Sequence, residues 1–208
     1  DGETLALHGI SHPAHVLHAR FRSAFHAIRR PGAMTLGFML RLSRRRSAAA
    51  ADGSAQKKWC GRISVEKSCE IYEIINDDPD RITKTISEKS LNKNIDVIIT
   101  TGGTGLTGRD NTVHSIKSIA EIEIPGFGEL FRQLSYQKIG TSTIQSLASA
   151  FLVNKKYVFC LPGSVSAVKD ACNDILFYQL DIRHKPCNFI ELIPRLDEWL
   201  YRWDWRSR

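Results

Sequence analysis

The chain has 208 residues, a hydrophobic fraction of 42% and a formal net charge of +7 at pH 7. This length suits one domain, and this apolar content is enough to build a core. No stretch approaches the roughly 20 consecutive apolar residues of a membrane helix, so we expect no membrane-spanning segment. The five cysteines form no C-x-x-C pair, which argues against a disulfide framework and a zinc site and favours a reducing, cytoplasmic location.

The positive charge is concentrated near the N-terminus. Residues 1–56 carry eight Arg, no Lys and three acidic residues, a net charge of +5, whereas residues 57–208 have a net charge of only +2. A nucleic-acid-binding protein is expected to place its basic surface on the folded domain itself. We therefore expect no nucleic-acid partner.

The composition also changes near residue 60. Between residues 5 and 51 there is no Asp or Glu, while Arg, Ser and Ala are frequent. A mitochondrial transit peptide has this composition, and so does a poorly ordered extension, which we favour. We expect residues 1–32 to be an extension and residues 33–198 to form a single domain. The remaining ten residues, 199–208, hold three of the four Trp and are expected to form an aromatic, basic tail that anchors on its own or a neighbouring subunit.

Short apolar segments alternate with helical patterns along the domain. Strands are predicted at residues 34–42, 71–75, 95–99 and 157–161. Helices are predicted at residues 79–90, from near residue 112, at 126–134, at 142–152 and from about residue 165 to 178. This alternation predicts the α/β class, with three layers (α/β/α) and a mostly parallel central sheet.

Three loops that follow strands carry the candidate functional residues. They comprise residues 76–78, 101–110 and 162–164, and they are rich in glycine, small hydroxyl side chains and carboxylates. In a sheet of this class, ligands bind beyond the carboxyl ends of the strands. We therefore expect these three loops to share one edge of the sheet.

The glycine-rich loop matches the letters of two phosphate-binding motifs but fails both in context. Residues 103–108 read G-x-G-x-x-G, yet the acidic strand end expected about 20 residues further on in a dinucleotide fold is absent. The P-loop pattern fails because Arg109 and Asp110 stand where Lys and Ser or Thr are needed. Glycine N–H groups can still bind phosphate, and a tight turn without a ligand is the open alternative.

Two of the loops contribute carboxylates, namely Asp77, Asp78 and Asp110. Carboxylates beside a phosphate site repel the substrate unless Mg²⁺ lies between them, and Mg²⁺ is commonly held by one or two carboxylates plus phosphates. With the glycine loop and the nearby Arg109, they favour nucleotidyl or phosphoryl transfer. Asp77 and Asp78 also suit helix capping ahead of Pro79, and the two roles are compatible.

Residues 100–110 (TTGGTGLTGRD) resemble the signature of the MoaB/MogA molybdopterin adenylyltransferase family. The resemblance extends from about residue 71 to residue 196, and two of the blocks are more similar to MoaB than to MogA. Four further blocks match in the same order: residues 125–132 (PGFGELFR), 139–146 (IGTSTIQS), 161–164 (LPGS) and 179–189 (QLDIRHKPCNF).

The resemblance implies a molybdopterin-binding-domain-like fold and the adenylylation of molybdopterin by ATP with Mg²⁺, releasing pyrophosphate. It assigns catalytic roles to Asp77 and Asp110, with Mg²⁺ binding between them, and it implies a homotrimer or homohexamer. It also implies that molybdopterin and ATP are bound by a larger set of residues: Thr101, Gly102, Gly103, Thr104, Gly105, Ser142, Thr143, Pro162, Gly163 and Ser164.

One departure from the family concerns its first loop, which reads Ser-Asp-Thr-Arg. The best match here is residues 42–47 (LSRRRS), which places Arg44 where the family has an acid. A non-catalytic molybdopterin-binding carrier or scaffold is therefore an alternative, although the presence of Asp77 and Asp110 favours the enzyme. We do not expect a multidomain molybdenum insertase, because 208 residues leave no room for the further domains.

Overall fold

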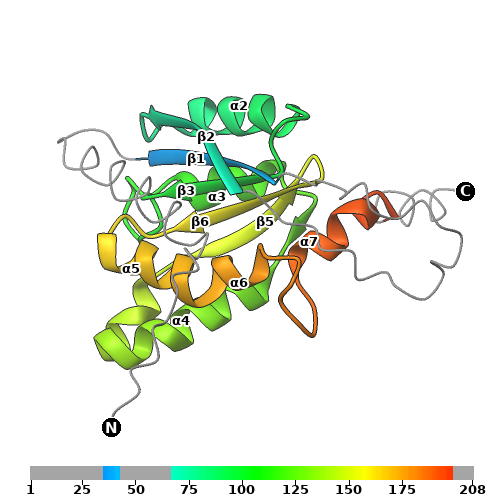
Figure 1. Cartoon of the computed structure of the whole chain (residues 1–208). Helices are drawn as coiled ribbons and strands as arrows, with labels where there is room; N and C mark the ends of the chain where they lie inside the picture. The colour runs from blue at the N-terminus through cyan, green and yellow to red at the C-terminus, as the bar shows by residue number, and fades with distance from the viewer. Residues whose placement is uncertain (1–34, 43–66, 199–208) are drawn as a thin grey trace, which may run out of the picture.

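The computed structural model describes residues 35–42 and 67–198 (Figure 1). The predictions for residues 1–32, for Arg44 and its loop, and for the tail at 199–208 lie outside the described residues. The strands are β1 (Thr35–Leu42), β2 (Lys67–Ile75), β3 (Val97–Thr101), β4 (Ile122–Glu123), β5 (Ser149–Val153) and β6 (Lys156–Leu161). The helices are α2 (Pro79–Ser90), α3 (Thr112–Ile119), α4 (Pro125–Ile139), α5 (Val165–Asp170), α6 (Phe177–Gln179) and α7 (Phe189–Leu192), with a π-helical turn, η3 (Ala171–Leu176), and 3₁₀ turns η2 (Gly140–Gln145) and η4 (Ile193–Arg195).

The central sheet has the strand order β2-β1-β3-β6-β5-β4. Its neighbouring strands are parallel only between β3 and β6, and the other four described pairings are antiparallel. The prediction of a mostly parallel sheet was therefore wrong, and the sheet is mixed. The reason is that β1 lies between β2 and β3 and runs opposite to both.

The second cause of antiparallel pairing is a strand that the sequence pattern predicted as a helix. Residues 142–152 form the end of η2 followed by β5, which pairs with β6 across a tight hairpin. Both residues of that turn, Asn154 and Lys155, have positive φ angles of 47° and 63°. This is the conformation that a two-residue hairpin turn requires. The apolar side chains of β5 are buried in the sheet, so a short apolar run was mistaken for a helix.

Helices cover both faces of the sheet, which confirms the α/β class with three layers. On one face, Ile82 and Ile86 of α2 and Ile116 of α3 pack in a core cluster with Ile98 of β3 and Val158 of β6. On the other face, a second cluster joins α4, α5, η3 and α7 to the opposite sides of the same strands, and Figure 1 shows α4, α5 and α6 together on that side. The strands β3, β5 and β6 are therefore buried on both faces.

The three loops that carry the candidate residues lie at the same edge of the sheet, as expected. The strand β2 is antiparallel to β1, which is antiparallel to β3, while β3 is parallel to β6. The strands β2, β3 and β6 thus point the same way, although β1 separates two of them. Among the described residues, no helix is both long and apolar enough to cross a membrane.

Candidate functional site

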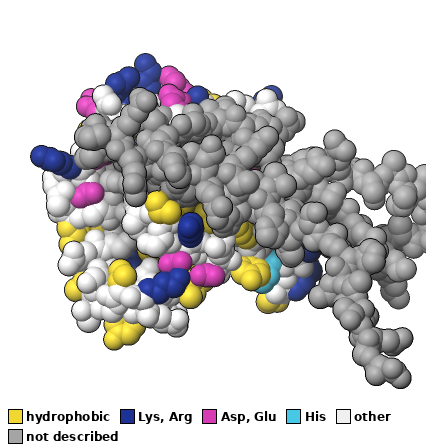
Figure 2. Space-filling view, turned by 60° about the vertical axis from the view of Figure 1, so that its left-hand side comes forward, with side chains coloured by type: hydrophobic (Ala, Val, Ile, Leu, Met, Phe, Trp, Pro, Cys, Tyr) yellow, Lys and Arg dark blue, Asp and Glu magenta, His cyan; other side chains and the backbone are white. Residues whose placement is uncertain are grey.

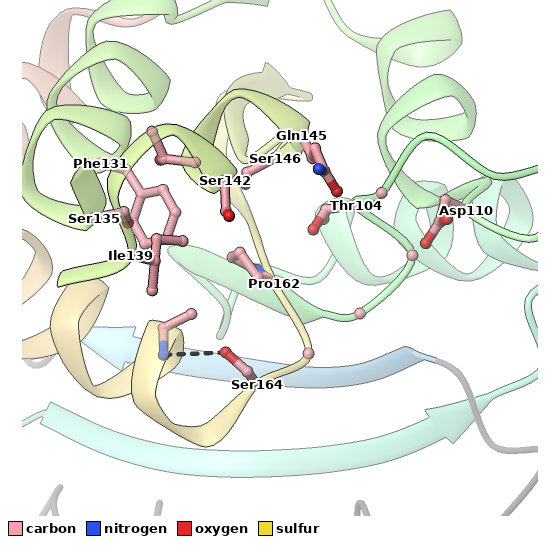
Figure 3. A pocket seen from close by; sticks show the side chains of 16 residues that line it. Thr104, Asp110, Phe131, Ser135, Ile139, Ser142, Gln145, Ser146, Pro162 and Ser164 are labelled. Carbon is pink, nitrogen blue, oxygen red and sulfur yellow. Dashed lines mark hydrogen bonds between the residues drawn. The ribbon is translucent and has the colours of Figure 1, made fainter.

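A pocket of about 480 Å³ opens at this edge of the sheet, between the glycine-rich loop, the end of α4, η2 and the loop after β6 (Figure 3). All of the site residues predicted from the sequence line this pocket except Asp77 and Thr101. Sequence reasoning missed Phe131, Ser135 and Ile139 on α4, as well as Gln145, Ser146 and Ala167. The missed α4 residues share one side of the helix at a spacing of four, but this spacing also describes an ordinary core-facing side.

The glycine-rich loop reaches the pocket through backbone conformations that other residues rarely adopt. Gly102 and Gly103 have φ angles of 95° and 62°, and the Gly102 N–H donates to the Leu161 carbonyl at 2.9 Å. A Cβ atom on Gly103 would lie 2.2 Å from Thr112 Oγ1 and 3.2 Å from Asp77 Oδ1. The loop therefore passes directly between the start of α3 and the Asp77 carboxylate, where only glycine fits.

Asp110 closes the far end of this loop and is held by it. Its Oδ2 atom accepts hydrogen bonds from the Thr107 hydroxyl at 2.6 Å and from the Thr107 N–H at 3.0 Å. The Thr107 hydroxyl bond lowers the pKa of Asp110 below its usual value; burial opposes this shift, and the backbone N–H groups of Gly105 and Thr107 add to it. Asp110 is therefore a carboxylate whose charge the protein already stabilises.

Asp77 lies in the opposite environment on the other side of the glycine loop. Both of its carboxylate oxygens are out of contact with solvent and make no hydrogen bond within the part of the chain that the structure describes. Burial raises the pKa of Asp77, the Asn111 backbone offsets part of the rise, and the charge of Asp110 adds to it. The neighbouring Asp78 caps α2 by accepting from the Arg81 N–H at 2.9 Å. The capping role thus belongs to Asp78, and apart from the weak effect of the Asn111 backbone the Asp77 carboxylate has no partner among the described residues.

The wall opposite the glycine loop is neutral and rich in hydroxyl groups. It comprises Ser142 and Thr143 of η2, followed by Gln145 and Ser146. The Thr143 hydroxyl donates to the Arg132 carbonyl at 3.2 Å, which fastens η2 to α4. In Figure 3, the side chains of α4 lie at one end of the pocket and Asp110 lies at the other. The pocket therefore has a mixed apolar and hydroxyl end and an acidic end.

The third predicted loop, residues 162–164, forms the floor between these ends. The Ser164 hydroxyl caps α5 by accepting from the Ala167 N–H at 3.3 Å (Figure 3). Thr101 is buried at the end of β3, behind the pocket, and its hydroxyl makes no hydrogen bond within the described residues. No Lys or Arg is among the described residues that line the pocket.

Known proteins resemble both the sequence and the fold. The family model for a probable molybdopterin binding domain matches residues 64–181. Molybdenum cofactor biosynthesis protein B of Escherichia coli K12 is 40% identical over 116 residues, covering 56% of this chain and 68% of the relative. The protein of the same name from Staphylococcus aureus Mu50 is 46% identical over 118 residues, covering 56% and 70%.

A solved structure supports the same relationship. The crystal structure of a molybdenum cofactor biosynthesis protein B matches with a TM-score of 0.53 at 35% identity, covering 61% of this chain and 73% of that one. The fold is thus that of a probable molybdopterin-binding domain. The chain is a member of the probable molybdopterin-binding domain family of molybdenum cofactor biosynthesis, which confirms the resemblance seen in its sequence motifs.

Proposed function

We propose that this pocket catalyses the adenylylation of molybdopterin by ATP in the presence of Mg²⁺. The observation that carries the proposal is the pair of unlike carboxylates on the two sides of the glycine loop. Asp110 is stabilised by Thr107, whereas the oxygens of Asp77 are buried without a partner among the described residues. Such an unsatisfied buried carboxylate costs stability, and enzymes keep groups of this kind where a ligand or cation satisfies them.

The residues present fit a Mg²⁺ ion. Mg²⁺ prefers oxygen ligands and is commonly held by one or two carboxylates together with substrate phosphates. Asp77 and Asp110 would hold the ion, and it would relieve the electrostatic repulsion between them, which adds to the rise in the pKa of Asp77 that burial causes. When bound, the ion would neutralise charge on the phosphates of the substrates.

In the proposed reaction, an oxygen of the terminal phosphate of molybdopterin attacks the α-phosphorus of ATP. The new P–O bond forms as the bond from the α-phosphorus to the bridging oxygen breaks, and pyrophosphate leaves with that electron pair. The chain contributes mainly by holding the two phosphate groups in line. The backbone of residues 102–105 would approach the phosphates closely, and the hydroxyl group of Ser142 would orient the substrates from the opposite wall, which the Thr143 hydroxyl fastens to α4.

Incubation of the full chain with molybdopterin, ATP labelled at the α-phosphate and Mg²⁺ tests this function. We expect the label to move to molybdopterin with release of one pyrophosphate per transfer. Tight binding of molybdopterin without any transfer would contradict the enzyme and support the alternative, a carrier or scaffold of the same pathway. No binding of either substrate would contradict both.

We also propose that the chain assembles into a homotrimer or homohexamer. Several large hydrophobic side chains are exposed on α4 and η2, including Leu130, Tyr136, Ile139 and Ile144. Hydrophobic patches are also visible on the face shown in Figure 2. Exposed apolar surface of this kind commonly marks an interface between subunits. Light scattering is expected to give three or six times the 23.4 kDa of one chain, and a monomer would contradict the proposal.

A further inference from the structure

The two walls of the pocket belong to different parts of the chain and are joined by a main-chain hydrogen bond. The glycine loop forms one wall, and residues 142–146 form the other. The N–H of Leu147, directly after the second wall, donates to the carbonyl of Thr104 in the glycine loop at 2.8 Å. The distance between the walls therefore depends on where residue 147 is held.

Arg132 of α4 forms hydrogen bonds to the main chain on both sides of Leu147. One guanidinium nitrogen, Nη1, donates to the carbonyl of Ala148 at 3.1 Å and, more weakly, to that of Ser146 at 3.4 Å. These two carbonyls flank Leu147 on either side. The backbone carbonyl of Arg132 in turn accepts from the Thr143 hydroxyl at 3.2 Å. A single residue thus fixes the hydroxyl-rich wall at Thr143 and Ser146, and the chain directly after it at Ala148.

The guanidinium also carries a charge that no carboxylate offsets within the described residues. Arg132 is half-buried and has no ion pair in that part of the chain, and its charge is directed at carbonyl dipoles. Phe131, the residue before Arg132, lines the pocket. Ser146, whose carbonyl accepts a hydrogen bond from Arg132, also lines it. Because a half-buried charge is screened less than an exposed one, its field extends to the pocket. A wall without any Lys or Arg of its own would thereby become attractive to an anion.

We propose that Arg132 is a positioning residue of this site, which sets the distance between the two pocket walls and gives the neutral wall a positive potential toward anionic substrates. The inference rests on the proposed function only in that the anions are taken to be ATP and molybdopterin. Arg132 acts through residues 143–148 and touches no reacting atom. Its two effects, bridging and charge, are separable by substitution, because Lys keeps the charge but its Nζ atom ends one atom short of the Nη1 atom that makes both bonds.

The experiment compares Arg132→Lys, Arg132→Met and Arg132→Gln with a control, Arg195→Met. Arg195 is exposed, pairs with Glu198 at 2.9 Å and lies in η4, outside the pocket lining. Three quantities are measured: the hydrogen-exchange rate of the Leu147 amide, and kcat and KM for Mg²⁺-ATP at low and high salt.

We expect Leu147 exchange to accelerate in all three Arg132 variants and not in Arg195→Met. The KM for ATP should rise about tenfold in Arg132→Met and Arg132→Gln, the size of one lost charge or hydrogen bond, with a weaker salt dependence than in the wild type. Arg132→Lys should recover most of KM while kcat stays reduced, because the charge is present and the bridge is not. A merely structural role would lower thermal stability without this split between KM and kcat.

Leu147 exchange that matches Arg195→Met in every Arg132 variant would overturn the positioning role. An unchanged KM in Arg132→Met would overturn the electrostatic role. If the wild type transfers no adenylyl group, the proposed function fails, and the exchange rate of Leu147 still decides whether Arg132 holds the walls together. If Arg132→Met does not fold, the Lys and Gln variants provide the same comparison.

Discussion

The loops after β2 and β3 each present one carboxylate to the same glycine turn, and the protein treats the two groups differently. Asp110 receives hydrogen bonds from Thr107 and has a lowered pKa. The carboxylate oxygens of Asp77 are out of contact with solvent and make no hydrogen bond within the described residues, and their burial raises the pKa of Asp77. The fold stabilises the ionised form of Asp110, whereas it destabilises the ionised form of Asp77. From this difference we infer that Asp110 is held by the fold before any ligand binds and that Asp77 binds a cation.

The largest expected effect follows from removing either charge. Asp77→Asn and Asp110→Asn should each reduce adenylyl transfer by about a hundredfold or more, the usual loss when a charge-stabilising group is removed, while the fold survives. Steady-state kinetics and circular dichroism measure the two outcomes. The control is Asp78→Asn, which removes a neighbouring charge but keeps an Asn cap on α2, so its activity should stay within about twofold of the wild type. Wild-type turnover in both site variants would contradict the catalytic roles assigned to Asp77 and Asp110.

A smaller effect is expected from the loop that separates the two carboxylates. Gly103→Ala forces a side chain into a position with φ of 62°, where its Cβ meets Thr112 Oγ1 at 2.2 Å. We expect the free energy of unfolding to fall by about 2 kcal/mol, from backbone strain and crowding together. A Cβ on Gly108 meets nothing within 4 Å, so Gly108→Ala should be close to neutral. Urea denaturation of both variants is the measurement, and equal losses would show that the close approach is not what constrains the loop.

The smallest effect concerns the bond that distinguishes Asp110 from Asp77. Thr107→Val removes the hydroxyl donor at 2.6 Å but leaves the N–H donor at 3.0 Å. The free energy of unfolding should fall by about 1 kcal/mol, and the pKa of Asp110 should move up toward its usual value, followed by NMR titration. Thr85→Val on α2 is the control, because the Thr85 hydroxyl makes no hydrogen bond within the described residues. An unshifted Asp110 pKa would show that the loop backbone alone stabilises this carboxylate.

Local sequence patterns predicted most elements of the fold, and the failures occurred where tertiary pairing decides the outcome. The helix at Pro79–Ser90 and the strand at Lys156–Leu161 follow from a proline start and from a continuous apolar run. The strand Ser149–Val153 does not, because a short apolar run suits a helix or a buried strand equally well. Strand direction was also missed, since the position of β1 between β2 and β3 depends on long-range contacts.

The placement of the candidate residues at one edge of the sheet was predicted better than the sheet that supports them. The shared edge depends only on the direction in which β2, β3 and β6 run, and this direction is common to all three despite the inserted strand. The motifs also placed Ser142 and the glycine loop in one pocket. Two properties had no sequence signal: the α4 residues that close the pocket, and the contrast between Asp77 and Asp110, which arises from burial and hydrogen bonding in three dimensions.

The central claim, that Asp77 is kept for a cation while Asp110 is stabilised by the fold, is tested most directly by urea unfolding of the wild type, Asp77→Asn and Asp110→Asn. The pKa of Asp77 is raised in the folded state, so the stability it contributes is present below the usual carboxyl pKa of 3.8 and is lost as pH rises through the raised value. The pKa of Asp110 is lowered, so its contribution is present above 3.8 and is lost as pH falls through the lowered value. At pH 7 in EDTA, we therefore predict that Asp77→Asn is more stable than the wild type and Asp110→Asn less stable, and that Mg²⁺ stabilises only the wild type. A less stable Asp77→Asn in EDTA, or equal stabilisation of all three proteins by Mg²⁺, would contradict the account.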